Sequence, residues 1–207
     1  MCIRDSSYAG PGGAAGSPLY SAAYAVGASA DGSLGDFDYG VWIGDSSGPK
    51  QATNSFEYLV AYNGIENLTI KAIIADDPYY DTENIWASYD YGDFTFAVEY
   101  VATDYTDNDG SYEYNDNALY SSSAVEEYDA TVFMVYKAFG NAGLTLRYTD
   151  ATVKVGGEDI EYEKTTISPS YAFSDNVFGL IEFSQEELSA AGAPDQDSAA
   201  VELIYSF

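Results

Sequence analysis

The sequence contains no histidine and only one cysteine, Cys2. The lack of histidine excludes Ser-His triads and histidine metal sites, and one cysteine allows neither an internal disulfide nor a cysteine metal site. Bases are also scarce, since 7 Lys and Arg stand against 34 Asp and Glu, for a net charge of -27. There is no basic stripe and no RNA-binding motif, so we expect no nucleic-acid partner. No nucleophile, base and orienting group recur together, and we predict a protein that is not an enzyme and holds no cofactor or metal.

The sequence also lacks any run of about 18 apolar residues, which excludes a transmembrane helix. A membrane-spanning β-strand needs only about 9–11 residues and leaves no such run. The acidity alone would suit a disordered chain, but 21 Tyr and 10 Phe, together with Val and Ile, recur at regular spacing. That composition favours a folded sheet.

The last ten residues, 198–207, alternate between apolar and mixed side chains. One face carries Ala199 and the series Val201, Leu203, Tyr205 and Phe207. Period-two alternation predicts a strand with one apolar face, and this strand is still in register at its terminal aromatic residue. Either a membrane barrel strand or the edge strand of a soluble β-sandwich would fit this segment taken alone.

The same alternation recurs from residue 19 to the end, and we predict eleven antiparallel up-and-down strands. Short turns alternate with longer polar loops, as in outer-membrane barrels. The expected tight turns include residues 31–35, 92–93, 140–143 and 174–176, and the expected polar loops include residues 44–54, 76–83 and 103–127. The predicted fold class is therefore all-β, an antiparallel transmembrane β-barrel over residues 19–207.

Charged side chains follow the polar face of the predicted strands. The bases expected to point into a pore are Lys71, Lys137, Arg147 and Lys164. The acids expected there are Glu57, Asp90, Glu99 and Glu182. Aromatic residues fall mainly at the strand ends of the other face, as in the aromatic girdles of membrane barrels, although ordinary strand propensity also enriches them.

The terminal strand VELIYSF, with the pattern of turns and loops before it, resembles the Gram-negative general porins, which are trimeric channels of sixteen strands. The resemblance implies a homotrimer in the lipid bilayer of the outer membrane that passes small hydrophilic solutes. It also implies that Val201, Leu203, Tyr205 and Phe207 form the signal read by the barrel-assembly machinery. In that family one loop narrows the pore, and residues 7–18 would be the end of that loop.

The start of the chain does not fit a biological amino terminus. Residues 1–6, MCIRDS, lack the features of a secretory signal and resemble translated sequencing-adapter text. Single-chain bacterial barrels normally have an even number of strands, so eleven strands suggest an amino-terminally truncated fragment of a larger, sixteen-stranded barrel. We expect the eleven strands to form a curved sheet that is either open or forced to close.

The acid excess predicts a passive channel that prefers cations. Two alternatives stay open: a structural or adhesive outer-membrane barrel without a channel, and a soluble secreted β-rich protein. The acidic segments 76–77 and 104–116 could bind Ca²⁺ or Mg²⁺, but neither has the spacing of a calcium loop. We therefore interpret them as solvated loops.

Overall fold

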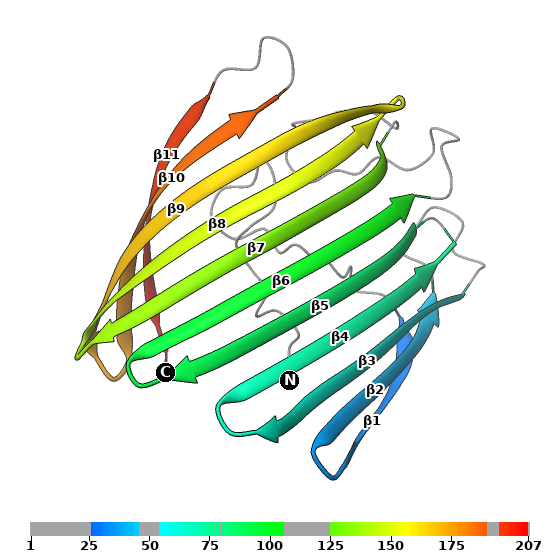
Figure 1. Ribbon diagram of the computed structural model, residues 1–207. Helices are drawn as coiled ribbons and strands as arrows, with labels where there is room; N and C mark the ends of the chain where they lie inside the picture. The colour runs from blue at the N-terminus through cyan, green and yellow to red at the C-terminus, as the bar shows by residue number, and fades with distance from the viewer. Residues whose placement is uncertain (1–25, 46–53, 79, 106–124, 190–194, 207) are drawn as a thin grey trace.

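The computed structural model describes residues 26–45, 54–78, 80–105, 125–189 and 195–206 and contains eleven β-strands in one sheet (Figure 1). The strands are β1 (Gly27–Leu34), β2 (Phe37–Asp45), β3 (Asn54–Ile65), β4 (Leu68–Asp77), β5 (Tyr80–Tyr91), β6 (Phe94–Tyr105), β7 (Val125–Phe139), β8 (Ala142–Val155), β9 (Glu158–Ser174), β10 (Val177–Leu188) and β11 (Gln196–Tyr205). Residues 1–18 and Phe207, for which predictions were made above, lie outside the described residues. Among the described residues, no helix is long and apolar enough to cross a membrane.

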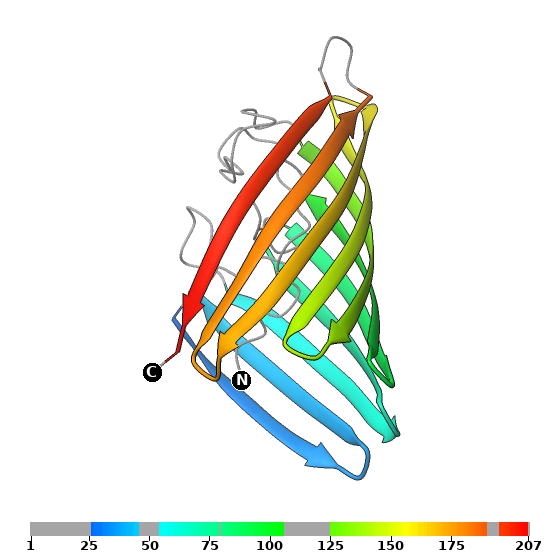
Figure 2. The same ribbon diagram turned by 90° about the vertical axis from the view of Figure 1, so that its left-hand side faces the viewer.

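Every strand pairs antiparallel with the next in sequence, in the order β1 to β11. The prediction of eleven antiparallel up-and-down strands is confirmed. Within the described residues, β1 and β11 each have a neighbour on one side only, so the sheet is open. Figure 2 shows the sheet from the side as a curved wall with β11 and β1 at its two margins.

Two-residue turns join the strands at one end of the sheet, which we call the turn end. Gly35, Asn67, Gly92 and Gly140 lie in four of these turns with φ near +60°. Glycine adopts this left-handed conformation without steric cost, and asparagine tolerates it better than most residues. The opposite end, which we call the loop end, carries the connections after β2, β4, β6, β8 and β10.

Several predicted boundaries were wrong: the predicted loops 44–54 and 103–127 overlap the ends of β2, β3, β6 and β7, and two further predicted segments are largely strand. Residues 31–34 continue β1 and the turn begins at Gly35, because Asp31 to Leu34 stay in register with Phe37 to Gly40 of β2. The predicted acidic loop at 76–83 is mostly strand, since Asp76 pairs with Asp81 and Asp77 with Tyr80. Asp76 and Asp81 are exposed, and the buried Asp77 accepts a hydrogen bond from Ser55, so these strand ends accommodate acids and acidity did not mark the end of the strand pairing.

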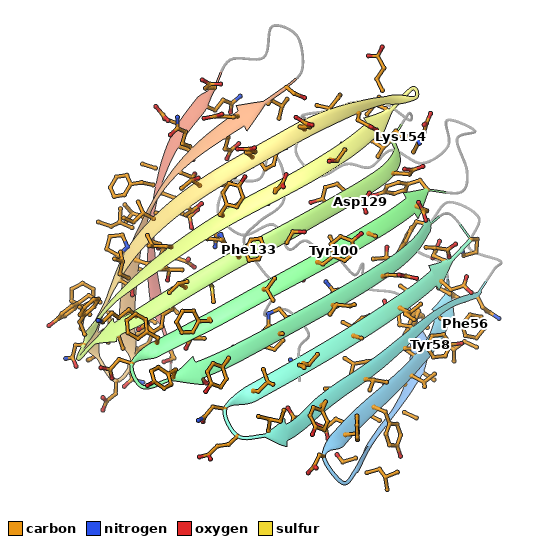
Figure 3. The ribbon with its side chains drawn as sticks, in the orientation of Figure 1. Phe56, Tyr58, Tyr100, Asp129, Phe133 and Lys154 are labelled. Atoms are coloured by element: carbon orange, nitrogen blue, oxygen red, sulfur yellow. The ribbon has the colours of Figure 1, made fainter. Side chains whose placement is uncertain are left out.

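The two faces of the sheet differ in exposure and chemistry. The convex outer face turns toward the viewer in Figure 3, where Tyr58, Tyr100 and Phe133 lie on it. Large apolar side chains of this face are exposed on every strand, including Val60 at 49% and Ile85 at 54%. On the concave inner face side chains converge, and Glu99, Arg147 and Lys164 are buried there.

A row of mainly apolar residues, which we call the apolar row, crosses the inner face from strand to strand. Its members, each paired in register with the next, are Leu59, Ile73, Asn84, Val101, Ala130, Ala151, Tyr162 and Leu188. Val101 and Tyr162 are fully buried, and they pack with Ala130 and Ala151 in one cluster. This row lies directly beside the charged residues of the inner face.

Candidate functional site

A charged row lies next to the apolar row on the inner face, one step closer to the turn end. It runs through Lys71, Trp86, Glu99, Val132, Thr149, Lys164 and Glu186, each the register partner of the next. Three of the predicted pore-lining residues, Lys71, Glu99 and Lys164, therefore share one line across the sheet. Strand alternation points every second side chain to this face. The pairing of neighbouring strands then brings residues that are far apart in sequence together in one row.

The inner-face bases of β8 and β9 are held by carboxylates of β10. Arg147 donates from Nη2 to Glu182 Oε2 at 3.1 Å, and both side chains are buried, 8% and 7% exposed. Lys164 Nζ lies 2.8 Å from Glu186 Oε1, and Lys164 is 2% exposed. Close pairing lets a buried charge offset its desolvation cost. Each pair is also electrically neutral when seen from a distance.

Lys71 is held differently. Its Nζ lies 4.9 Å from the centre of the Trp86 ring on the neighbouring strand, and both side chains are half-buried. A cation over an aromatic face is attracted by the ring quadrupole but keeps its full charge. Lys71 is thus positioned by a ring, and none of the ion pairs between described residues includes it.

Lys137 does not lie on the inner face, so its predicted pore-lining position was wrong. It pairs in register with Phe94, and its Nζ lies 4.5 Å and 5.0 Å from the ring centres of Phe94 and Phe139, on the outer face near the turn end. Both faces of β7 carry apolar side chains, Val132 and Met134 inward and Phe133 and Val135 outward. The charge of Lys137 was therefore a poor guide to the orientation of the strand. A lysine near a strand end can lay its stem along apolar surface and extend its ammonium toward water.

The four predicted acids all take inner-face positions. Glu99 is buried and accepts a hydrogen bond from Asn84 Nδ2 at 2.8 Å. Asp90 is exposed near the turn end and accepts a hydrogen bond from Thr95 Oγ1 at 2.6 Å. Glu57 is half-buried opposite Trp42 and Ala75, and Glu182 binds Arg147 as described above.

Strand β11 carries the apolar series predicted for an assembly signal. Val201, Leu203 and Tyr205 lie on the outer face, exposed at 79%, 70% and 64%. This strand pairs only with β10 among the described strands. Its outer face is therefore apolar and exposed from Ala199 to Tyr205.

The sequence analysis missed Glu186 and gave no role to Trp86, Asn84 or Thr149. Glu186 follows Glu182 and Ser184 at the same alternation, and continuing that alternation by one more polar-face position would have found it. No sequence signal identifies Trp86 as the partner of Lys71, because that contact depends on the register between β4 and β5.

The acidic segments do not form a metal centre in the part of the chain that the structure describes. Asp76 and Asp104 are the register partners of Asp81 on the outer face, at the loop end. No group of three or more potential ligands is placed to hold a metal ion within the described ranges. Residues 106–116 lie outside those ranges.

Comparison with known proteins identifies the fold. No family model matches the chain, and no curated protein matches it. Among solved structures it is similar to a porin from Rhodobacter, with 14% sequence identity and a TM-score of 0.61 over 94% of this chain and 65% of that one. It is also similar to an anion-selective porin from Comamonas acidovorans, with 15% identity and a TM-score of 0.63 over 86% of this chain and 58% of that one.

The sheet has the porin fold. The chain spans less than two thirds of the length of either of these porins. This agrees with eleven strands that form an open part of a larger porin barrel. At such low identities the likeness concerns the course of the backbone, and it carries no residue of either porin over to this chain.

Proposed function

We propose that the chain forms the greater part of the wall of an outer-membrane porin, a passive channel for small hydrophilic solutes and ions. The observation that carries this proposal is the division of side chains between the two faces of one curved sheet. Exposed apolar residues line the outer face of every strand, and the ion pairs Arg147–Glu182 and Lys164–Glu186 lie on the inner face. Such a wall suits lipid on one side and water on the other.

The open margins of the sheet belong to the same proposal. An unpaired strand edge leaves backbone polar groups without partners, which the hydrocarbon of a bilayer does not tolerate. In the working channel both β1 and β11 therefore pair with further strands. The porins of similar fold are longer than this chain, which supports a larger closed barrel.

The outer face is suited to contact both the membrane and the assembly machinery. Its apolar belt would contact the lipid bilayer, and the exposed series Val201, Leu203 and Tyr205 would be read by the barrel-assembly machinery. We also propose that the protein forms a homotrimer in the bacterial outer membrane.

The channel is proposed to prefer cations. Besides the four acids predicted from sequence, the inner face carries Asp31, Asp38, Asp77, Glu186 and Glu202. The described bases of that face are Lys71, Arg147 and Lys164. A water-filled lumen with this excess of carboxylates attracts cations. The similar fold of an anion-selective porin indicates that wall charges, rather than the fold, set the preference.

Planar-bilayer recording tests the proposal. Protein extracted from outer membranes in detergent should insert as discrete conductance steps, and a salt gradient should give a reversal potential of the sign expected for cation preference. Insertion without conductance would favour a structural or adhesive barrel. A protein that stays monodisperse without detergent would favour the soluble alternative, and a reversal potential of opposite sign would refute the cation preference alone.

A further inference from the structure

The bases that the structure describes fall into two groups by the way they are held. Arg147, Lys164 and Lys154 each lie within 3.1 Å of a carboxylate oxygen. Lys71 and Lys137 lie instead over aromatic rings. Of these two, Lys71 is on the inner face and Lys137 on the outer face.

The way each base is held decides how far its electric field reaches into the lumen. A base and a carboxylate about 3 Å apart form a dipole whose field falls off quickly, so a permeating ion several ångströms away meets almost no net charge. The β8–β10 part of the wall contains two such pairs. A lysine over an indole ring keeps its unit charge, and its field reaches into the lumen.

We propose that Lys71 is the specificity-determining base of the channel, and that it restrains the cation preference set by the carboxylates. Arg147 and Lys164 stabilise the wall but contribute little to selectivity. This inference rests on the proposed channel function. It also assigns different roles to the three inner-face bases, whereas the sequence pattern gave all three the same role.

The position of Lys71 supports this role. It pairs in register with Ala61 on one side and Trp86 on the other, so a small side chain and a flat ring flank it. Trp86 is in turn the register partner of Glu99, whose Oε1 accepts a hydrogen bond from Asn84. The nearest carboxylates of its row, Glu99 beyond the Trp86 ring and Asp38 beyond Ala61, therefore each lie two strands away, and neither is among the described ion pairs of a base.

Reversal potentials of four variants test the inference. Replacing Lys71 with Gln should raise the ratio of cation to anion permeability about fivefold at low salt, because a unit charge about 8 Å away acts through water with similar strength, but in opposite directions, on the cation and on the anion. Lys71→Arg should leave the ratio unchanged, because the charge stays. The paired double change R147Q/E182Q should also leave it unchanged. Lys137→Gln is the matched control, since it removes a ring-stacked lysine of the same type from the outer face and should have no effect.

The outcomes separate this inference from the proposed function. A wild-type protein that does not conduct would refute the channel itself. A conducting channel in which K71Q leaves the permeability ratio unchanged would overturn the role of Lys71 while leaving the channel intact. A shift in R147Q/E182Q as large as that in K71Q would also overturn it, because the paired bases would then act on the lumen.

Discussion

Arg147 and Glu182 form an ion pair across a strand to which neither belongs. The guanidinium on β8 reaches the carboxylate on β10 at 3.1 Å, and β9 lies between them. Thr166 of β9 is the register partner of Arg147, and both it and Ser168 are buried. Small side chains at these positions leave room for the arginine to lie across the strand, so the pair links three strands of the wall.

Breaking this ion pair on one side should cost more than removing it. Arg147→Gln leaves the buried Glu182 carboxylate without its cation, and we expect the free energy of unfolding to fall by about 3 kcal/mol. The double change R147Q/E182Q should recover most of that loss. Urea unfolding in detergent micelles measures both.

The exposed pair Lys154–Glu127 is the control for this test. Its atoms are 2.9 Å apart, close to the spacing in the Arg147 pair, but its side chains are 32% and 46% exposed. Lys154→Gln should therefore change stability little. An equal loss in the single and double variants of Arg147 would show that the pair does not behave as a coupled buried unit.

Two buried threonines on the inner face should tolerate loss of their hydroxyl groups. Thr149 and Thr166 are 0% and 2% exposed, and within the described ranges the Oγ1 atoms of both lack a hydrogen-bond partner. Valine has a similar shape without the polar atom, so Thr149→Val and Thr166→Val should leave the free energy of unfolding unchanged or raise it.

Thr82 provides the matched comparison for these valine variants. Its Oγ1 lies 3.0 Å from Thr103 Oγ1, and both residues are buried. Thr82→Val removes that hydrogen bond and should cost about 1 kcal/mol in the same urea experiment. A loss of that size in Thr149→Val or Thr166→Val would mean that these hydroxyl groups do form hydrogen bonds in the folded protein.

Adjacent residues of β6 should respond in opposite ways to a new charge. Val98 points outward and Ala97 inward, as their register partners Ala87 and Ser88 do. Val98→Lys places an ammonium against hydrocarbon and should cost about 2–4 kcal/mol near the midplane, whereas Ala97→Lys faces the lumen. The measurement is the urea midpoint of protein folded into lipid vesicles. Equal tolerance at both positions would argue against a lipid-facing outer surface.

The sequence predicted the faces of most strands because their two faces differ in polarity. In β8 and β9, Arg147 and Lys164 alternate with Leu146 and Ile167, and only one orientation keeps these two bases off the outer face. The same reasoning failed at β7, where Met134 and Phe133 are both apolar. There the register with β6 decides the orientation, and register depends on contacts between strands.

The arrangement of charges within the inner face could not be predicted from the sequence. Alternation indicated that Lys71, Arg147 and Lys164 share a face, but it could not distinguish a base over Trp86 from bases paired with Glu182 and Glu186. That difference depends on which residues meet two strands apart, and on how far each side chain extends across its neighbours. It is also the difference on which the proposed selectivity depends.

Cysteine accessibility along the turn half of β5 tests the division of the two faces most directly. In a Cys2→Ser background, single cysteines at positions 85 to 90 are treated with a membrane-impermeant, water-soluble thiol reagent after insertion into vesicles. The account predicts reaction at the inner positions of Trp86, Ser88 and Asp90 and protection at the outer positions of Ile85, Ala87 and Tyr89. Uniform reaction at all six positions, or protection of the inner three, would contradict it.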